Sequence, residues 1–225
     1  MLPPEPAAKS AAPSRRCMEL RACGYPELHV DGRPVALKLK RGLALLVYLS
    51  ELGGKAARAQ LAELLWPDAA AELGRARLRR LCHEVNTTLA LELLAGDGDA
   101  VWLAGGEGTL RSDVARLHAI ARRVLRTSAG DAAPSDDMAP ALDALCAPQA
   151  AGLLDGFELP SDSFMAWRDS RRAEHQQLLV RALSVAAAQC QARGEAERAE
   201  LGIRPSAQIE AAYERAHQRL APAPA

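Results

Sequence analysis

Apolar residues recur at helical spacing in three successive stretches of the first half of the chain, residues 40–52, 58–65 and 72–90. The third stretch carries its apolar residues on one stripe, formed by Leu78, Leu81, Cys82, Val85 and Leu89. Gly53 and Gly54 end the first stretch, and Pro67 ends the second because the residue before a proline avoids the helical conformation. The pattern therefore predicts three helices, of which the third is the longest.

Short segments of alternating polarity flank these helices. Residues 18–37 contain three of them, Met18–Cys23, Leu28–Val30 and Pro34–Leu37. With a turn at Asp31-Gly32, they predict a small antiparallel sheet. Leu93-Leu94 and residues 100–103 predict a second hairpin, which Gly105–Gly108 closes. The order of strands, three helices and hairpin is typical of a winged helix-turn-helix, whose longer helix enters the DNA major groove.

Beyond residue 110 the pattern is helical only. Helices are expected at 114–127, at about 140–146, from 163 to about 193 where Gly194 ends the helix, and at 206–220, with a loop at 128–140. The predicted fold class is therefore an α+β winged helix-turn-helix N-terminal domain, residues 17–108, followed by an all-α domain, residues 111–220. The Pro- and Ala-rich residues 1–16 are expected to be a disordered lead-in, and residues 221–225 a tail.

Composition narrows the function classes. The 28 basic and 28 acidic residues cancel, so any basic surface must be local. Five single cysteines and five dispersed histidines have no metal-ligand spacing, so we expect no metal site, no cofactor and a reducing, cytoplasmic setting. No apolar run is long enough for a membrane helix, and no signal peptide is evident. Catalytic motifs are missing, and Gly105–Gly108 lacks the lysine of a phosphate-binding loop, so we expect no enzyme.

The helix predicted at 72–90 carries the candidate DNA-binding residues. On a helical wheel, Arg80, His83 and Thr87 lie opposite the apolar stripe, where side chains reach base edges. Arg75, Arg77 and Arg79 flank that face and are suited to phosphates, as are Lys40 and Arg41 at the start of helix 40–52. The wing tip, Asp97-Gly98-Asp99, repels phosphate, so we expect the wing to stand off the minor groove or to be purely structural.

Several segments resemble one family. In the first half they are Val30–Val35, Lys40–Leu49 and, most specifically, Arg58–Asp68 with its LLWPD ending, followed by Arg75 and Leu78-Arg79. In the second half they are Ser112–Val114, Gly152–Phe157, Phe164–Arg168, residues 178–199 and Leu201–Ser206. Together these segments resemble the OmpR/PhoB-type winged-helix regulators that carry a bacterial transcriptional activator domain, of the antibiotic-regulatory-protein type.

The resemblance implies a transcriptional regulator, an activator, that binds double-stranded DNA. It also implies a helical domain of the tetratricopeptide (TPR-like) kind, through which the chain forms a homodimer or contacts RNA polymerase. Two features depart from the family. Glu84, Asn86 and Thr87 stand where relatives usually have arginine, and Glu200 joins directly to Leu201–Ser206 where relatives have further repeats. We therefore expect a shortened helical domain.

An alternative function remains open at this point. The acidic wing tip, Glu84 and the shortened helical half are also features of an interaction module that has lost effective DNA binding. Such a module would act through helices 114–127 and 163–193, with Phe164 and Trp167 as anchors for a partner. A failure to retard DNA at low salt would distinguish it from a DNA-binding regulator.

Overall fold

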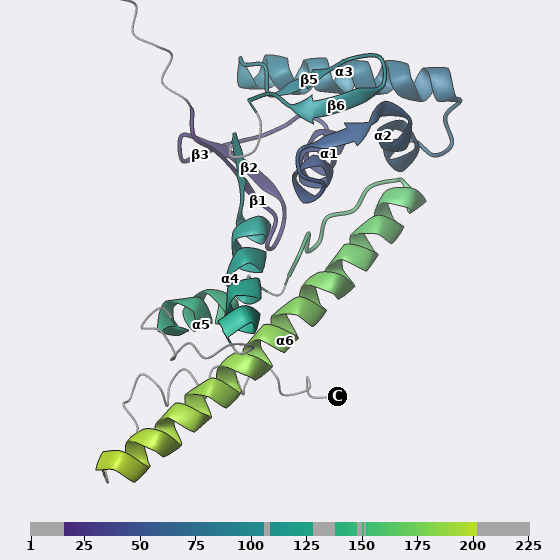
Figure 1. The fold of residues 1–225 in the computed structure, drawn as a ribbon. Coiled ribbons are helices and arrows are strands. Elements are labelled where there is room, and N and C mark those ends of the chain that lie inside the picture. Colours follow the sequence, from purple (N-terminus) through teal and green to yellow (C-terminus); the bar gives the residue numbers. More distant parts are fainter. Residues whose placement is uncertain (1–15, 106–108, 128–137, 148–149, 151, 202–225) are drawn as a thin grey trace, which may run out of the picture.

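The computed structural model describes residues 16–105, 109–127, 138–147, 150 and 152–201. It has a mixed N-terminal region with two small sheets, and a helical C-terminal part (Figure 1). The N-terminal elements are β1 (Met18–Arg21), β2 (Glu27–Val30), β3 (Arg33–Val35), α1 (Lys40–Glu51), β4 (Lys55–Ala57), α2 (Arg58–Leu65), α3 (Ala71–Leu89), β5 (Leu94–Gly96), β6 (Ala100–Leu103) and β7 (Leu110–Ser112). The later helices are α4 (Asp113–Thr127), α5 (Met138–Cys146) and α6 (Asp162–Leu201).

The two sheets contain both of the predicted hairpins. One sheet has the order β3-β2-β1-β7, with β1 antiparallel to β2 and parallel to β7. Asp31 and Gly32 turn between β2 and β3 with positive φ, as the Asp-Gly pair predicts. The other sheet has the order β4-β6-β5. Strands β4 and β7 were not predicted, because their partners are distant in the sequence, β6 for β4 and β1 for β7, so no local hairpin marks them.

The three helices of the N-terminal region lie where the apolar pattern places them. Along α3, Leu78, Leu81, Val85 and Leu89 are buried, which confirms these four members of the predicted stripe, while Cys82 is half-buried and packs against the core. Helices α2 and α3 cross closely at Gly74, where an added Cβ would lie 3.2 Å from the Ala62 side chain. The predicted order of short helix, long helix and hairpin is therefore present, with the exposed side of α3 turned away from the core.

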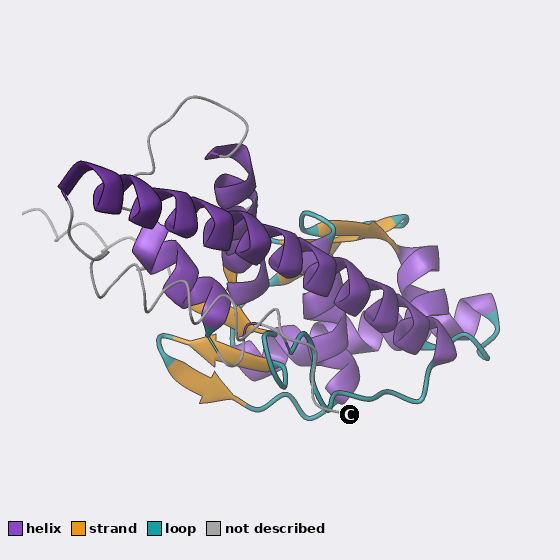
Figure 2. Ribbon diagram, turned by 90° about the horizontal axis from the view of Figure 1, so that it is seen from below, coloured by secondary structure: helices purple, strands orange, loops and turns teal. Residues whose placement is uncertain are grey.

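Two hydrophobic cores hold the molecule together. The first belongs to the N-terminal region but also takes in Leu153, Phe157 and Phe164 from far along the chain. The second lies among α4, α5 and α6. The N-terminal end of α6 is fixed to the first region, because the Ser161 hydroxyl donates to the carbonyl of Leu64 at 2.6 Å. Figure 2 shows α6 running along the molecule from this attachment to its far end.

One boundary in the helical part was predicted wrongly. Gly194 was expected to end the long helix, but α6 continues to Leu201. The residues around Gly194 are Ala, Glu, Gln and Arg, which are strong helix formers. A single glycine within a helix lowers its stability by only about 1 kcal/mol relative to alanine. The predicted helix 206–220, residues 1–15, the tail 221–225 and residues 128–137 of the predicted loop lie outside the described residues. None of the described helices has the length and apolarity needed to cross a membrane.

Candidate nucleic-acid interface

The exposed side of α3 carries the largest run of arginines in the N-terminal region. The residues that share this exposure are Arg75, Arg77, Arg79, Arg80, His83 and Thr87. Their opposite face is the buried leucine stripe, so the helix cannot rotate without exposing its core side. All six residues proposed on this helix from the sequence are therefore displayed together along its solvent side.

Asn86 joins α3 to the hairpin formed by β5 and β6. Its amide oxygen accepts the backbone N–H groups of Leu93 and Leu94, at 3.1 and 2.9 Å. Its amide nitrogen donates to the carbonyl of Leu94 at 2.8 Å. Asn86 stands where the family resemblance predicts an arginine, and the structure gives it a different role. It fixes the angle between α3 and the hairpin.

The hairpin tip is tied to the start of α2. Arg58 donates from its side chain to the carbonyl of Asp97, and its backbone N–H donates to the carbonyl of Asp99 at 2.7 Å. The Asp97 carboxylate accepts the backbone N–H groups of Asp99 and Ala100, which hold the pKa of this carboxyl below its usual value. Asp97 therefore closes its own turn and keeps its negative charge.

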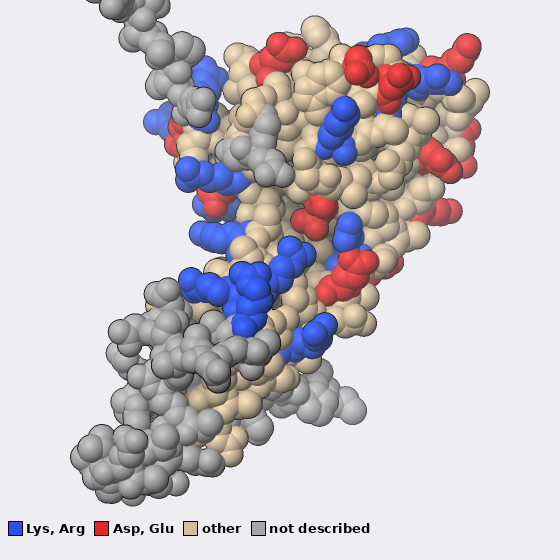
Figure 3. Space-filling view, in the orientation of Figure 1, with Lys and Arg blue, Asp and Glu red and all other residues tan. Residues whose placement is uncertain are grey.

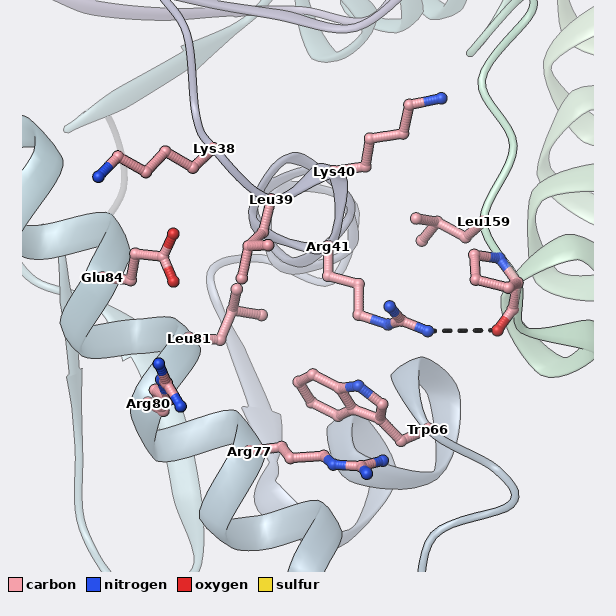
Figure 4. A pocket seen from close by; sticks show the side chains of 11 residues that line it. Lys38, Leu39, Lys40, Arg41, Trp66, Arg77, Arg80, Leu81, Glu84 and Leu159 are labelled. Atoms are coloured by element: carbon pink, nitrogen blue, oxygen red, sulfur yellow. Dashed lines mark hydrogen bonds between the residues drawn. The ribbon is translucent and has the colours of Figure 1, made fainter.

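Arg41 at the start of α1 is used within the fold (Figure 4). Its Nε donates to the carbonyl of Leu65 at 3.0 Å, and its Nη2 donates to the carbonyl of Pro160 at 3.3 Å. The guanidinium also lies 5.5 Å from the centre of the Trp66 ring. Burial, and the nearby charge of Arg77, lower the pKa of Arg41. Arg41 thus uses two of its five donors within the fold, whereas Arg75 uses one.

A cleft of about 820 Å³ separates the start of α1 from α3. Cations line it from both sides, namely Lys38, Lys40, Arg41, Arg77 and Arg80, together with one carboxylate, Glu84. Lys38 and Lys40 are exposed beside it (Figure 4). The approach of Lys38 to Arg77 and Arg80 depends on tertiary packing, which the sequence pattern does not show.

The described residues contain no group of three or more side chains suited to a metal ion. Cys82, half-buried on the inner side of α3, has its pKa raised to about 11, chiefly by burial, so its thiol is protonated and unreactive at neutral pH. The arrangement is suited to holding a polyanion by charge and hydrogen bonds.

Comparison with known proteins finds similarity only to solved structures. No protein-family model matches the chain, and no curated protein matches it either. A solved structure of Mycobacterium tuberculosis EmbR in complex with a low affinity phosphopeptide is similar, with a TM-score of 0.45 and 16% sequence identity. The match covers 92% of this chain and 67% of that one. At this level of similarity, the function has to be argued from the residues of the chain itself.

Proposed function

We propose that this chain is a transcriptional regulator that binds double-stranded DNA through a winged helix-turn-helix. In this proposal α2 and α3 are the helix pair, β5 and β6 are the wing, and α3 enters the major groove. The observation that carries the proposal is the arginine-bearing exposed side of α3, fixed in direction by a buried leucine stripe and by the Asn86 contacts.

The dimensions and charges of this surface suit a duplex. A major groove about 12 Å wide admits one α-helix, and arginine reads guanine through two parallel hydrogen bonds. We assign base contacts to Arg80, His83 and Thr87, and phosphate contacts to Arg75, Arg77, Arg79 and Lys40. Lys38 joins the phosphate set because it lines the same cleft as Arg77 and Arg80. Arg41 supports the site by holding α1 to the end of α2.

The test is gel retardation or fluorescence anisotropy with duplex DNA across a salt series. For the wild-type protein we expect affinity to fall steeply as salt rises, because lysine and arginine displace counterions from phosphates. The double variant Arg79→Ala/Arg80→Ala is expected to bind at least tenfold more weakly. It should also have a smaller salt slope, by about 0.9 for each phosphate that is no longer neutralised.

A matched control removes the same charge elsewhere. Arg33 on β3 and Arg181 on α6 are exposed and lie on other elements. The variant Arg33→Ala/Arg181→Ala should keep wild-type affinity and salt slope. If the wild-type protein fails to retard any duplex at low salt, the DNA-binding proposal is wrong, and an interaction module of the same fold takes its place. If it does retard DNA, genomic footprinting of the bound fragments identifies its target sites.

A further inference from the structure

The cleft between α1 and α3 contains apolar surface that a contact with phosphate does not require. Its apolar side chains come from four segments of the chain, Leu39 at the start of α1, Trp66 after α2, Leu81 on α3 and Leu159 before α6. Leu81 and Leu159 are buried, Trp66 is half-buried, and Leu39 is 47% exposed. Figure 4 shows Leu39 and Leu81 in the middle of the cleft, with cations around them. The cleft therefore presents an apolar patch inside a positively charged rim.

Leu39 is the side chain in this cleft that the fold itself does not explain. It is the N-cap residue of α1, a position that favours serine, threonine, aspartate or asparagine, and it forms no side-chain cap hydrogen bond. It is also exposed between two lysines, Lys38 and Lys40. An apolar ligand in the cleft would cover Leu39, which accounts for a leucine at a position that favours a small polar residue.

The rim of the cleft favours an anion. Five cations line it, against one carboxylate, that of Glu84. The charge of Arg77 contributes to lowering the pKa of Arg41, so these two guanidinium groups repel each other and an anion near both would be stabilised. Arg77 and Arg80 are exposed, and an exposed guanidinium can pair with a carboxylate through two hydrogen bonds or stack on an aromatic ring.

We infer that this cleft binds a small organic anion with an aromatic body, such as a fused-ring carboxylate, and that this ligand competes with DNA. The cleft volume of about 820 Å³ lies within the range of about 300–1,000 Å³ that is typical of small-molecule sites. The ring contacts Leu39 and Trp66, while the carboxylate pairs with Arg77 or Arg80. Because Lys38, Arg77 and Arg80 are also assigned to DNA, an occupied cleft excludes DNA from them. The ligand site stands by itself, and only the competition rests on the proposed DNA binding.

Isothermal titration calorimetry on the full chain tests the site, with 2-naphthoate as the probe at constant ionic strength. We expect a dissociation constant below about 1 mM, which the size of this probe allows. Two further probes separate ring from charge, since inorganic phosphate has no ring and 2-naphthylmethanol has no charge. Each should bind at least about tenfold more weakly than 2-naphthoate. If phosphate binds as tightly as 2-naphthoate, the cleft holds anions in general and the inference is wrong.

The variant Leu39→Ser separates the ligand from DNA. Serine is a favoured N-cap residue, so α1 should remain folded, and no charge is altered. This variant should bind 2-naphthoate at least about fivefold more weakly, because apolar contact is lost, and should keep wild-type DNA affinity. Leu52→Ser, at the other end of α1, is the matched control and should change neither affinity. Circular dichroism checks the fold, and Leu39→Asn replaces Leu39→Ser if that variant is unfolded. Unchanged binding of 2-naphthoate by a folded Leu39 variant overturns the inference.

Fluorescence anisotropy with duplex DNA tests the competition. At saturating 2-naphthoate the DNA affinity of the wild-type protein should fall at least about fivefold, and that of Leu39→Ser should fall less. A DNA affinity that stays constant while 2-naphthoate is bound overturns the competition. If the wild-type protein binds no duplex even without 2-naphthoate, the proposed function fails instead, and the calorimetry alone decides whether the ligand site exists.

Discussion

The two hydrophobic cores of this molecule are built from different side chains. The first has only three alanines among its 29 buried residues and contains Tyr48, Phe157 and Phe164. Within the described part of the chain, the second has six alanines among twelve buried residues and no buried Phe, Tyr or Trp. Alanine lets helices pack closely but removes little apolar area from water. The first core therefore contributes most of the stabilisation, and it is the one that holds α3.

The side chains at the junction between the two cores are part of the first core. Phe164 packs near Phe157 and Trp167, with ring centroids 5.9 and 5.4 Å away, and Trp167 lies 4.9 Å from Tyr48 on α1. Arg168 donates to the carbonyl of Phe157 at 2.8 Å. The start of α6 is thus anchored by aromatic packing, while its later turns rest on alanine. The helical part can therefore loosen at its far end while the core that holds α3 keeps its shape.

The largest expected effect comes from the junction. Phe164→Ala should lower the free energy of unfolding by about 3–5 kcal/mol, because it leaves a cavity in a fully buried aromatic cluster. Leu183→Ala in the second core should cost less, about 2–3 kcal/mol. Urea denaturation followed by circular dichroism measures both. Phe164→Leu is the control and should recover part of the stability. Equal losses at the two sites would contradict the comparison between the cores.

Asn86→Ala is expected to have the next largest effect. It leaves two backbone N–H groups and one carbonyl of the hairpin without their partner, at a cost of about 1–3 kcal/mol. Faster amide exchange at Leu93 and Leu94 would locate the damage. Asn86→Asp is the matched control, because aspartate still accepts both N–H groups. If Asn86→Ala leaves both stability and exchange unchanged, Asn86 does not fix the hairpin.

Low pH should lower the free energy of unfolding through the protonation of His118 and His175, which lie beside the second core. The carbonyl of Ala150 can only accept, so His175 donates to it from Nε2 at 2.6 Å, and its Nδ1 accepts from Nε2 of His118 at 2.9 Å. In this arrangement the His175 ring is neutral, with its single proton on Nε2. Burial, the partner ring and the charges of Arg122 and Arg171 lower the pKa of His118 from 6.5 to about 4, against a smaller opposing effect of Glu174. Burial also lowers the pKa of His175, although the Ala150 contact and Asp113 oppose this.

Because folding lowers the pKa of both histidines, protonation at low pH destabilises the folded chain. The unfolded chain takes up protons near pH 6.5, while the folded chain resists them until about pH 4. The stabilisation is complete above pH 6.5 and is lost as pH falls toward 4. Because His118 is partly exposed, the expected loss is on the order of 1 kcal/mol. His118→Gln should flatten the pH dependence of unfolding in this window. An unchanged profile would show that the pair is not responsible.

The smallest expected effect is at Glu84, the carboxylate in the cleft between α1 and α3. Glu84→Gln removes a charge that repels phosphate, and DNA affinity should rise about two- to fivefold, more at low salt than at high salt. Glu92→Gln, at an exposed position after α3, is the control and should have little effect. Fluorescence anisotropy measures both variants. A lower affinity for Glu84→Gln would instead assign Glu84 to reading a base.

Much of the interface could be predicted from the sequence. The wheel of residues 72–90 correctly separated the buried stripe from the exposed arginines, because helical periodicity is a local property. It could not predict what Arg41 and Asn86 do. Their partners, Pro160 and Leu65 for Arg41 and Leu93 and Leu94 for Asn86, lie beside them only after folding.

The sequence by itself determined the helices, the turn at Asp31-Gly32 and the identity of the cations on α3. Each depends on residues within one or two turns of the chain. The tertiary structure alone decided that β7 pairs with β1, that Phe157 and Phe164 complete the first core, and where basic and acidic side chains gather on the surface (Figure 3). The physical reason is that these features join segments about 90 or more residues apart, and local periodicity carries no information about such pairings.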